Sequence, residues 1–373
     1  MSFAQSSCGK DTLFFRIFAR CMKEAGSIEA ISLTFTAGVA AGVFLSTVSR
    51  HPYPLLAATF ALTVLATGLS LREGARSLLP LFLLAGVSMA LTRCLTGPGG
   101  GFPALQGAGT ALRGLIDRIP FAHEETAPLL KALVTGDRSG LSYATKAVFR
   151  QSGASHLLAL SGLHIGILYL ILGKLTWVLG HSPAARRVRA GLAIVLSGAF
   201  TLMTGASPSI VRAFFFIGIN EILRLSRRPR KGVRVLCLAL LLQLALMPEA
   251  IGTVGFQLSY LAMAGIFLLY PHLEGWYPSG VRRDPLRALW KTAALSISCQ
   301  VFTAPLVWLR FRSFPVHFLI TNLLAIPLTT ALMGCAVLCL ALSGAGICPD
   351  IVVQATDALC ALLLHVLEII SSM

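Results

Sequence analysis

The sequence predicts an all-α protein, a polytopic integral membrane bundle of about eleven transmembrane helices with short amphipathic helices on its outer side. Of its 373 residues, 55% are hydrophobic and 12% are charged, whereas a soluble domain carries roughly twice that share of charge. Apolar runs recur along the whole chain, and lysine and arginine gather between alternate runs. These features exclude a soluble globular protein.

The apolar runs give the expected spans, with ends uncertain by a few residues. Several runs are shorter than the usual ~20 residues, so we expect those helices to tilt little or to enter only part of the bilayer. The run 316–342 contains Pro327 and is either one kinked helix or two half-helices. We place the spans at 28–47, 55–71, 78–92, 156–178, 189–204, 209–224, 234–248, 254–270, 289–309, 316–342 and 351–371.

The basic residues predict the orientation. The positive-inside rule places their clusters in the cytoplasm, together with the N-terminus, and places 93–155 and the C-terminus outside. The net charge of +16 therefore signals topology first, and a grip on phosphates at a channel exit stays an alternative. The clusters comprise Arg186, Arg187 and Arg189, then residues between Arg224 and Arg234, and then Arg282, Arg283, Arg287 and Lys291.

The outer stretch predicts two short amphipathic helices, at 127–134 and 142–151, with Ser142 as the N-cap of the second. Between them lies a turn with Gly136, Asp137 and Arg138. Asp137 and Arg138 form either a solvated pair, as is usual at a surface, or a fixed polar loop at the mouth of a pore.

The stretch 153–174 is long and apolar enough to cross a bilayer, yet its first half is polar. At about 100° per residue, His156, Ser161 and His164 share one side of a single helix. Polar side chains at membrane depth usually face a bundle interior or a wet cavity. The stretch therefore predicts an interior helix that lines a hydrated space, although both histidines could serve structural hydrogen bonds instead.

Other predicted spans also carry polar residues. Arg212 lies one turn inside a span, where it either snorkels to water, contacts a phosphate or joins a buried ion pair. Gln257 and Asn322 either bond a neighbouring helix or line a path. Cys335 and Cys339 are one helical turn apart, but no histidine or carboxylate is spaced to complete a zinc site. We therefore predict no metal and no cofactor, and the chain has no P-loop motif.

Five ordered blocks of sequence resemble one known family. The first joins T-G-D-R-S-G-L-S to S-G-A-S-H-L-L-A-L-S-G-L-H-I-G, and the others are L-M-T-G-A-S-P-S-I-V-R-A, M-P-E-A-I-G-T-V-G-F-Q-L-S-Y-L-A-M-A-G, Q-V-F-T-A-P-L-V-W-L-R-F-R-S-F-P and T-N-L-L-A-I-P-L. Together they are similar to the ComEC-type competence channel. The resemblance selects Gly136, Asp137, Arg138, Gly153, His156, Ser161, Gly162, His164, Gly205, Pro208, Arg212, Gly255, Gln257, Ser259, Pro305, Asn322 and Pro327 as DNA-path or motif residues.

The resemblance implies a channel that passes incoming single-stranded DNA across the bacterial cytoplasmic membrane during natural transformation. It divides the chain into a cytoplasmic basic segment at 1–27, a three-helix membrane segment at 28–96, a short outer linker at 97–126 and the channel domain at 127–371. Family members often carry an outer oligonucleotide-binding barrel and a metallo-β-lactamase-like nuclease domain. We expect neither in this chain, because a barrel needs more than 97–126 and no H-x-H-x-D-H run is present.

The expected partners are single-stranded DNA and membrane lipids. By the same resemblance, we expect a separate outer DNA receptor, a separate nuclease, and a cytoplasmic motor or single-strand-binding proteins. Two other functions stay open. A small-solute transporter would show inverted repeats, and none is evident. An intramembrane hydrolase would need Ser161 and His164 within hydrogen-bond reach, which residues three apart on one helix rarely achieve.

Overall fold

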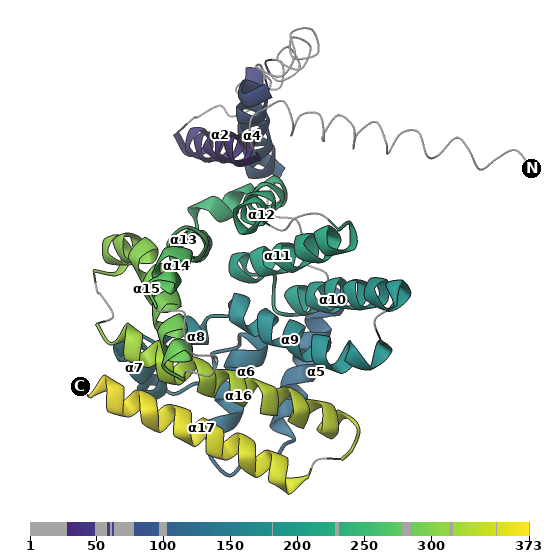
Figure 1. Cartoon of the computed structure of the whole chain (residues 1–373), viewed down its shortest axis with the longest axis vertical. Helices are drawn as coiled ribbons and strands as arrows, with labels where there is room; N and C mark the ends of the chain where they lie inside the picture. Colours follow the sequence, from purple (N-terminus) through teal and green to yellow (C-terminus); the bar gives the residue numbers. More distant parts are fainter. Residues whose placement is uncertain are drawn as a thin grey trace, which may run out of the picture. The chain divides into compact units, whose positions relative to one another are not determined.

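The computed structural model describes residues 28–48, 58–59, 62, 78–96, 103–180, 182–227, 231–277, 285–312, 316–347 and 349–372, and every regular element among them is helical (Figure 1). This confirms the all-α class. The predicted basic segment 1–27 and nearly all of the predicted span 55–71 lie outside these residues. The helices are α2 (Ile28–Val48), α4 (Leu78–Thr96), α5 (Pro103–Asp117), α6 (Thr126–Thr135), α7 (Tyr143–Gln151), α8 (Ser155–Leu158), α9 (Gly162–Leu175), η2 (Thr176–Leu179), α10 (Pro183–Met203), α11 (Pro208–Leu225), α12 (Gly232–Leu246), η3 (Pro248–Gly252), α13 (Val254–Leu268), α14 (Tyr270–Gly275), α15 (Pro285–Phe311), α16 (Phe318–Gly344) and α17 (Asp350–Ser371).

The chain forms two compact units. The first comprises residues 1–100 and 230–253 and contains α2, α4, α12 and η3. Glycine lets α2 and α4 approach closely, because a Cβ at Gly38 would lie 2.0 Å from the carbonyl oxygen of Leu83. Close contact through small residues is the usual way in which helices associate in a membrane. The Ser32 hydroxyl on α2 donates to the carbonyl oxygen of Cys237 on α12 at 3.1 Å.

The second unit, residues 101–229 and 254–373, is built around α6. Leu129, Ala132 and Leu133 on this helix are wholly buried, and they share one core with side chains from α5, α16 and α17. The helix predicted at 127–134 is thus present as α6, and neighbouring helices bury most of its apolar side chains. For α7 the prediction is correct: only Thr145 and Phe149 are buried.

Half of the predicted linker 97–126 is helix α5, which polar contacts fix to the core. The side chain of Asp117 pairs with Lys131 of α6, and Arg113 Nε lies 3.7 Å from Asp137 Oδ2. The turn after α5 is held from the far end of the sequence, because the N–H of Ala122 donates to Asp357 of α17 at 2.6 Å. The apolar stem of Lys131 extends past the core and places the ammonium group beside Asp117. A mostly buried helix can therefore carry this charged residue.

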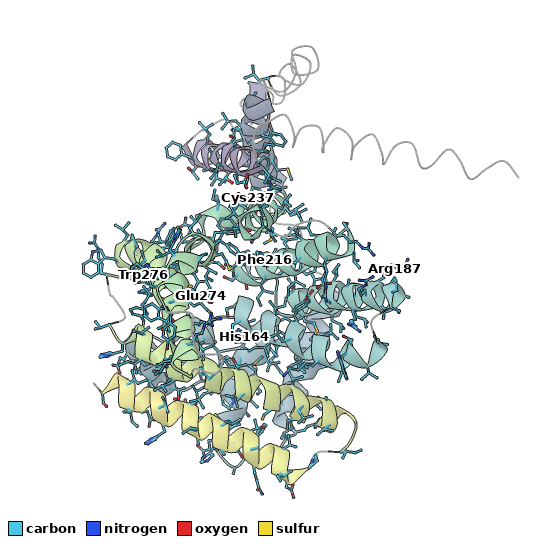
Figure 2. The ribbon with its side chains drawn as sticks, viewed as in Figure 1. His164, Arg187, Phe216, Cys237, Glu274 and Trp276 are labelled. Atoms are coloured by element: carbon cyan, nitrogen blue, oxygen red, sulfur yellow. The ribbon has the colours of Figure 1, made fainter. Side chains whose placement is uncertain are left out.

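Six helices among the described residues are long and apolar enough to cross a membrane: Ile28–Thr47, Gly162–Leu179, Val254–Gly275, Leu286–Phe311, Phe318–Gly344 and Asp350–Ser371. Many large apolar side chains on these helices are exposed, among them Leu170, Leu309 and Ile351. Trp276, labelled in Figure 2, directly follows the span Val254–Gly275 and is 73% exposed. The protein is thus a multi-pass membrane protein, while the expected count of about eleven spans stays a prediction. Helix α16 continues through Pro327 as one helix, not two half-helices.

Candidate functional site

The polar stretch that begins at Gly153 is broken into two helices. Helix α8 ends at Leu158, Ala159 has extended backbone angles, and α9 begins at Gly162. The prediction of one continuous helix across 153–174 is therefore wrong. Its three polar residues do not share a helix face, since His164 is wholly buried whereas His156 is exposed.

Ser161 is the N-cap of α9 and explains the break. Its hydroxyl accepts a hydrogen bond from the N–H of Leu163 at 3.3 Å, while its own N–H donates to His164 Nδ1 at 3.2 Å. This is a capping box with histidine in place of the usual glutamate or glutamine. Ser161 Oγ also lies 3.1 Å from His164 Nδ1, so the expectation that these side chains stay out of hydrogen-bond reach is wrong.

The capping box fixes the tautomer of His164. A backbone N–H can only donate, so Nδ1 must be the acceptor and Nε2 must carry the proton. Nε2 is buried and has no hydrogen-bond partner among the residues that the structure describes. Figure 2 shows His164 surrounded by helices of the second unit. His156 instead places Nδ1 3.2 Å from the carbonyl oxygen of Gly153, which has a φ of 80°.

The glycine-rich turn packs against this break. Gly136 ends α6 with φ of 79°, and a Cβ there would lie 2.4 Å from Cδ1 of Leu160. The next residue, Asp137, accepts hydrogen bonds from the hydroxyl of Ser139 at 2.6 Å and from its N–H at 3.0 Å. These bonds, and to a smaller degree Arg113, hold the pKa of Asp137 below its ordinary value. The turn therefore keeps its charge at neutral pH and is an ordered loop.

Replacing Gly136 with alanine is expected to destabilise the protein by about 1–3 kcal/mol, because the new side chain is strained at positive φ and overlaps Leu160. Unfolding of the detergent-solubilised protein by heat measures the change. Gly140→Ala is the matched control in the same turn, where the nearest atom to the new Cβ is 3.6 Å away. Adding Leu160→Ala should recover the part due to overlap, and a Gly136→Ala protein as stable as the control contradicts the assigned turn.

Arg212 on α11 lies deep in the second unit. Its side chain is 8% exposed, its Nη1 donates to the carbonyl oxygen of Ser259, and its guanidinium lies 5.9 Å from the ring centre of Tyr260. Within the described ranges, no carboxylate pairs with it. Of the three alternatives for this residue, snorkelling to water and a buried ion pair therefore have no support.

The remaining candidate residues differ in position and burial. Gly255 joins the Arg212 region, since its carbonyl oxygen accepts from the Ser209 hydroxyl at 3.2 Å, and Gly205 and Pro208 shape the turn into α11. Pro305 and Pro327, by contrast, are exposed within α15 and α16. Gln257 and Asn322 are half-buried, and Asn322 Oδ1 has no partner among described residues. Arg138 is exposed, and the partner of Asp137 is Arg113.

Sequence reasoning missed a buried acid. Glu221 on α11 is 4% exposed, accepts a short hydrogen bond from the hydroxyl of Tyr169 on α9, and lies 3.4 Å from Arg224. A signal was present, because a carboxylate inside the predicted span 209–224 is costly unless it is paired. The pair joins the two helices that also meet at Gly162 and Arg212.

A family model described as "Competence protein" matches residues 133–373. The chain belongs to the competence protein family. This confirms the resemblance seen in the sequence, and the matched range includes every candidate residue named above. No solved structure matches the chain.

Two curated relatives are similar in sequence to part of this competence protein. It is 24% identical over 206 residues to "ComE operon protein 3" of Bacillus subtilis (strain 168), covering 55% of this chain and 25% of that protein. It is 27% identical over 216 residues to "Uncharacterized protein YcaI" of Escherichia coli (strain K12), covering 54% of this chain and 27% of that one. The matched regions thus span about a quarter of each relative.

Proposed function

We propose that this competence protein passes incoming single-stranded DNA across the bacterial cytoplasmic membrane. The observation that carries the proposal is the buried Arg212, which has no carboxylate partner among described residues although it lies in an apolar membrane bundle. A conduit for a polyanion needs positive potential without a tight site, and one desolvated guanidinium provides it. Family membership and the relative named for the ComE operon support a role in DNA uptake.

The proposal includes an orientation and a set of partners. The N-terminus lies in the cytoplasm and the C-terminus outside, so the Gly136 turn and the starts of α9 and α11 are at the outer surface. Transport, not catalysis, is the task of this chain. A separate outer receptor captures DNA, a separate nuclease removes one strand, and a cytoplasmic motor or single-strand-binding proteins draw the strand inward.

Labelled DNA tests the proposal in a naturally competent host. Deleting the gene should leave DNA bound at the cell surface and abolish its entry to the cytoplasm, and the wild-type gene should restore entry. In the same strain, His164→Ala should reduce entry strongly because it removes the capping box, while His156→Ala at the exposed position should have a small effect. Normal entry in the deletion strain rejects DNA transport, and solute uptake by proteoliposomes would then favour a small-solute transporter.

The 3.1 Å contact between Ser161 Oγ and His164 Nδ1 favours a second candidate, an intramembrane hydrolase. The contact is a poor dyad, because the nitrogen that would take the hydroxyl proton already accepts the Ser161 N–H. Ser161→Asn separates the two roles, since asparagine caps a helix as well as serine does but has no nucleophilic hydroxyl. Full DNA entry with Ser161→Asn supports the cap, and loss of entry with normal protein levels supports the hydrolase.

A further inference from the structure

Three helices of the second unit run parallel and begin at the same end of the bundle. Gly162 at the start of α9 faces Arg212 and Ala213 of α11, and further along Tyr169 faces Glu221. Ser209 of α11 meets Gly255 of α13, and further along Phe216 stacks on Phe267 with ring centres 5.8 Å apart. The positive ends of three helix dipoles therefore meet at one place.

Arg212 adds a full positive charge at this place. Position Nη2 of its guanidinium lies 3.1 Å from where a Cβ of Gly162 would be, so it points at the first residue of α9. Among the residues that the structure describes, only Nη1 has an acceptor, the carbonyl oxygen of Ser259. Within the described ranges, the ionisable side chains that act on Arg212 are Tyr260 and Cys299, and both types are ordinarily neutral at pH 7.

One backbone N–H at the N-terminus of α9, beside that guanidinium, donates to no described residue. The N–H groups of Leu163 and His164 bond to Ser161, whereas the N–H of Gly162 has no partner within the described part of the chain. A helix N-terminus repels a cation, so a buried arginine here raises the energy of the empty arrangement. An anion between Nη2 and the Gly162 N–H is attracted both by the guanidinium and by the helix N-terminus, and so offsets their mutual repulsion.

From this geometry we infer that Arg212 and the N-terminus of α9 form a binding site for one phosphodiester group of single-stranded DNA. The inference rests on the proposed DNA transport and gives it a location. One phosphate oxygen accepts from Arg212 Nη2 and from the N–H of Gly162, in the space that the missing side chain of Gly162 leaves. A single phosphate contact orients the strand without the tight grip that stalls movement.

Salt-dependent binding tests the site. Purified protein in phosphatidylcholine nanodiscs is titrated with fluorescent oligothymidylate across a potassium chloride series. Arg212→Gln should weaken binding roughly tenfold and lower the slope of log affinity against log salt by about 0.7. Arg212→Lys should keep the slope, because it keeps the charge. With a methylphosphonate oligothymidylate, which has no backbone charge, wild type and Arg212→Gln should bind alike.

The outcomes separate this inference from the proposed function. If wild type does not bind oligothymidylate, DNA transport fails. If wild type binds and Arg212→Gln has the same affinity and slope, only the phosphate site fails. Inorganic phosphate, or phosphatidylglycerol added to the nanodiscs, is then tested as a competitor. If either displaces oligothymidylate from wild type at levels that leave Arg212→Gln unaffected, the site binds a free anion or a lipid headgroup, and the inference of a DNA phosphate site is overturned.

A second variant covers the case in which Arg212→Gln does not fold. Gly162→Ala keeps every charge but places a Cβ 3.1 Å from Nη2, so it should lower both affinity and slope. Gly166→Ala on the same helix is the control, since a Cβ there meets nothing within 4 Å. Equal binding by these two variants overturns the site.

Discussion

Replacing Gly162 with leucine is expected to reduce transformation by roughly tenfold to a hundredfold, the effect of losing one charge-assisted contact. The first atom of the new side chain already lies 3.1 Å from Arg212 Nη2 and 3.5 Å from Cβ of Ala213. The further carbons of leucine therefore occupy the space of the guanidinium and displace it from the start of α9. Transformation frequency in a competent deletion host that carries the variant measures the effect.

The control for this variant is Gly166→Leu, one helical turn further along α9. It adds the same side chain to the same helix, but no atom lies within 4 Å of the new Cβ. Membrane-fraction immunoblots confirm equal protein levels in both strains. Equal and near-normal transformation with both substitutions contradicts a role for the start of α9 in the DNA path.

The fold class could be predicted from the sequence because it depends on composition. The break before α9 could not be predicted in this way. Apolar residues flank Ser161 and Gly162 on both sides, so the run has the average hydropathy of a single span. The capping signal is also concealed, because His164 stands where a capping box usually has glutamate or glutamine. Ser142 is an ordinary N-cap ahead of an amphipathic pattern, and there the prediction was correct: its hydroxyl accepts from the N–H of Thr145 at 3.0 Å.

The burial of α6 could not be predicted from local pattern. Its Lys131 gives the segment one polar side, which indicates a surface helix, but the residues that cover it come from α5, α16 and α17. Arg212 was recognised as a costly cation in a span, yet its neighbours Ser259 and Tyr260 lie far away in sequence. Which helices run parallel is a property of the tertiary fold, so the meeting of three helix starts could not be predicted.

The hydrogen bond between Tyr169 and Glu221 is expected to give a large coupling energy. Tyr169→Phe leaves the buried Glu221 carboxylate with a single partner among the described side chains, Arg224, whose side chain is 51% exposed. The lost bond to a charged group should cost about 1.5–3 kcal/mol of unfolding free energy. Pairing Tyr169→Phe with Glu221→Leu removes both polar groups, and the double variant should be nearly as stable as wild type because no buried group is left unsatisfied.

Unfolding in mixed micelles with increasing dodecyl sulfate, followed by tryptophan fluorescence, gives the four free energies of this double-mutant cycle. Additive losses within about 0.5 kcal/mol would show that Tyr169 and Glu221 do not interact, and the parallel packing of α9 on α11 would then lose one of its two points of support. Non-additive losses fix the register of the two helices, and that register is what places Gly162 opposite Arg212. The stability of a pair near one end of α11 thus tests the geometry of the proposed phosphate site near the other.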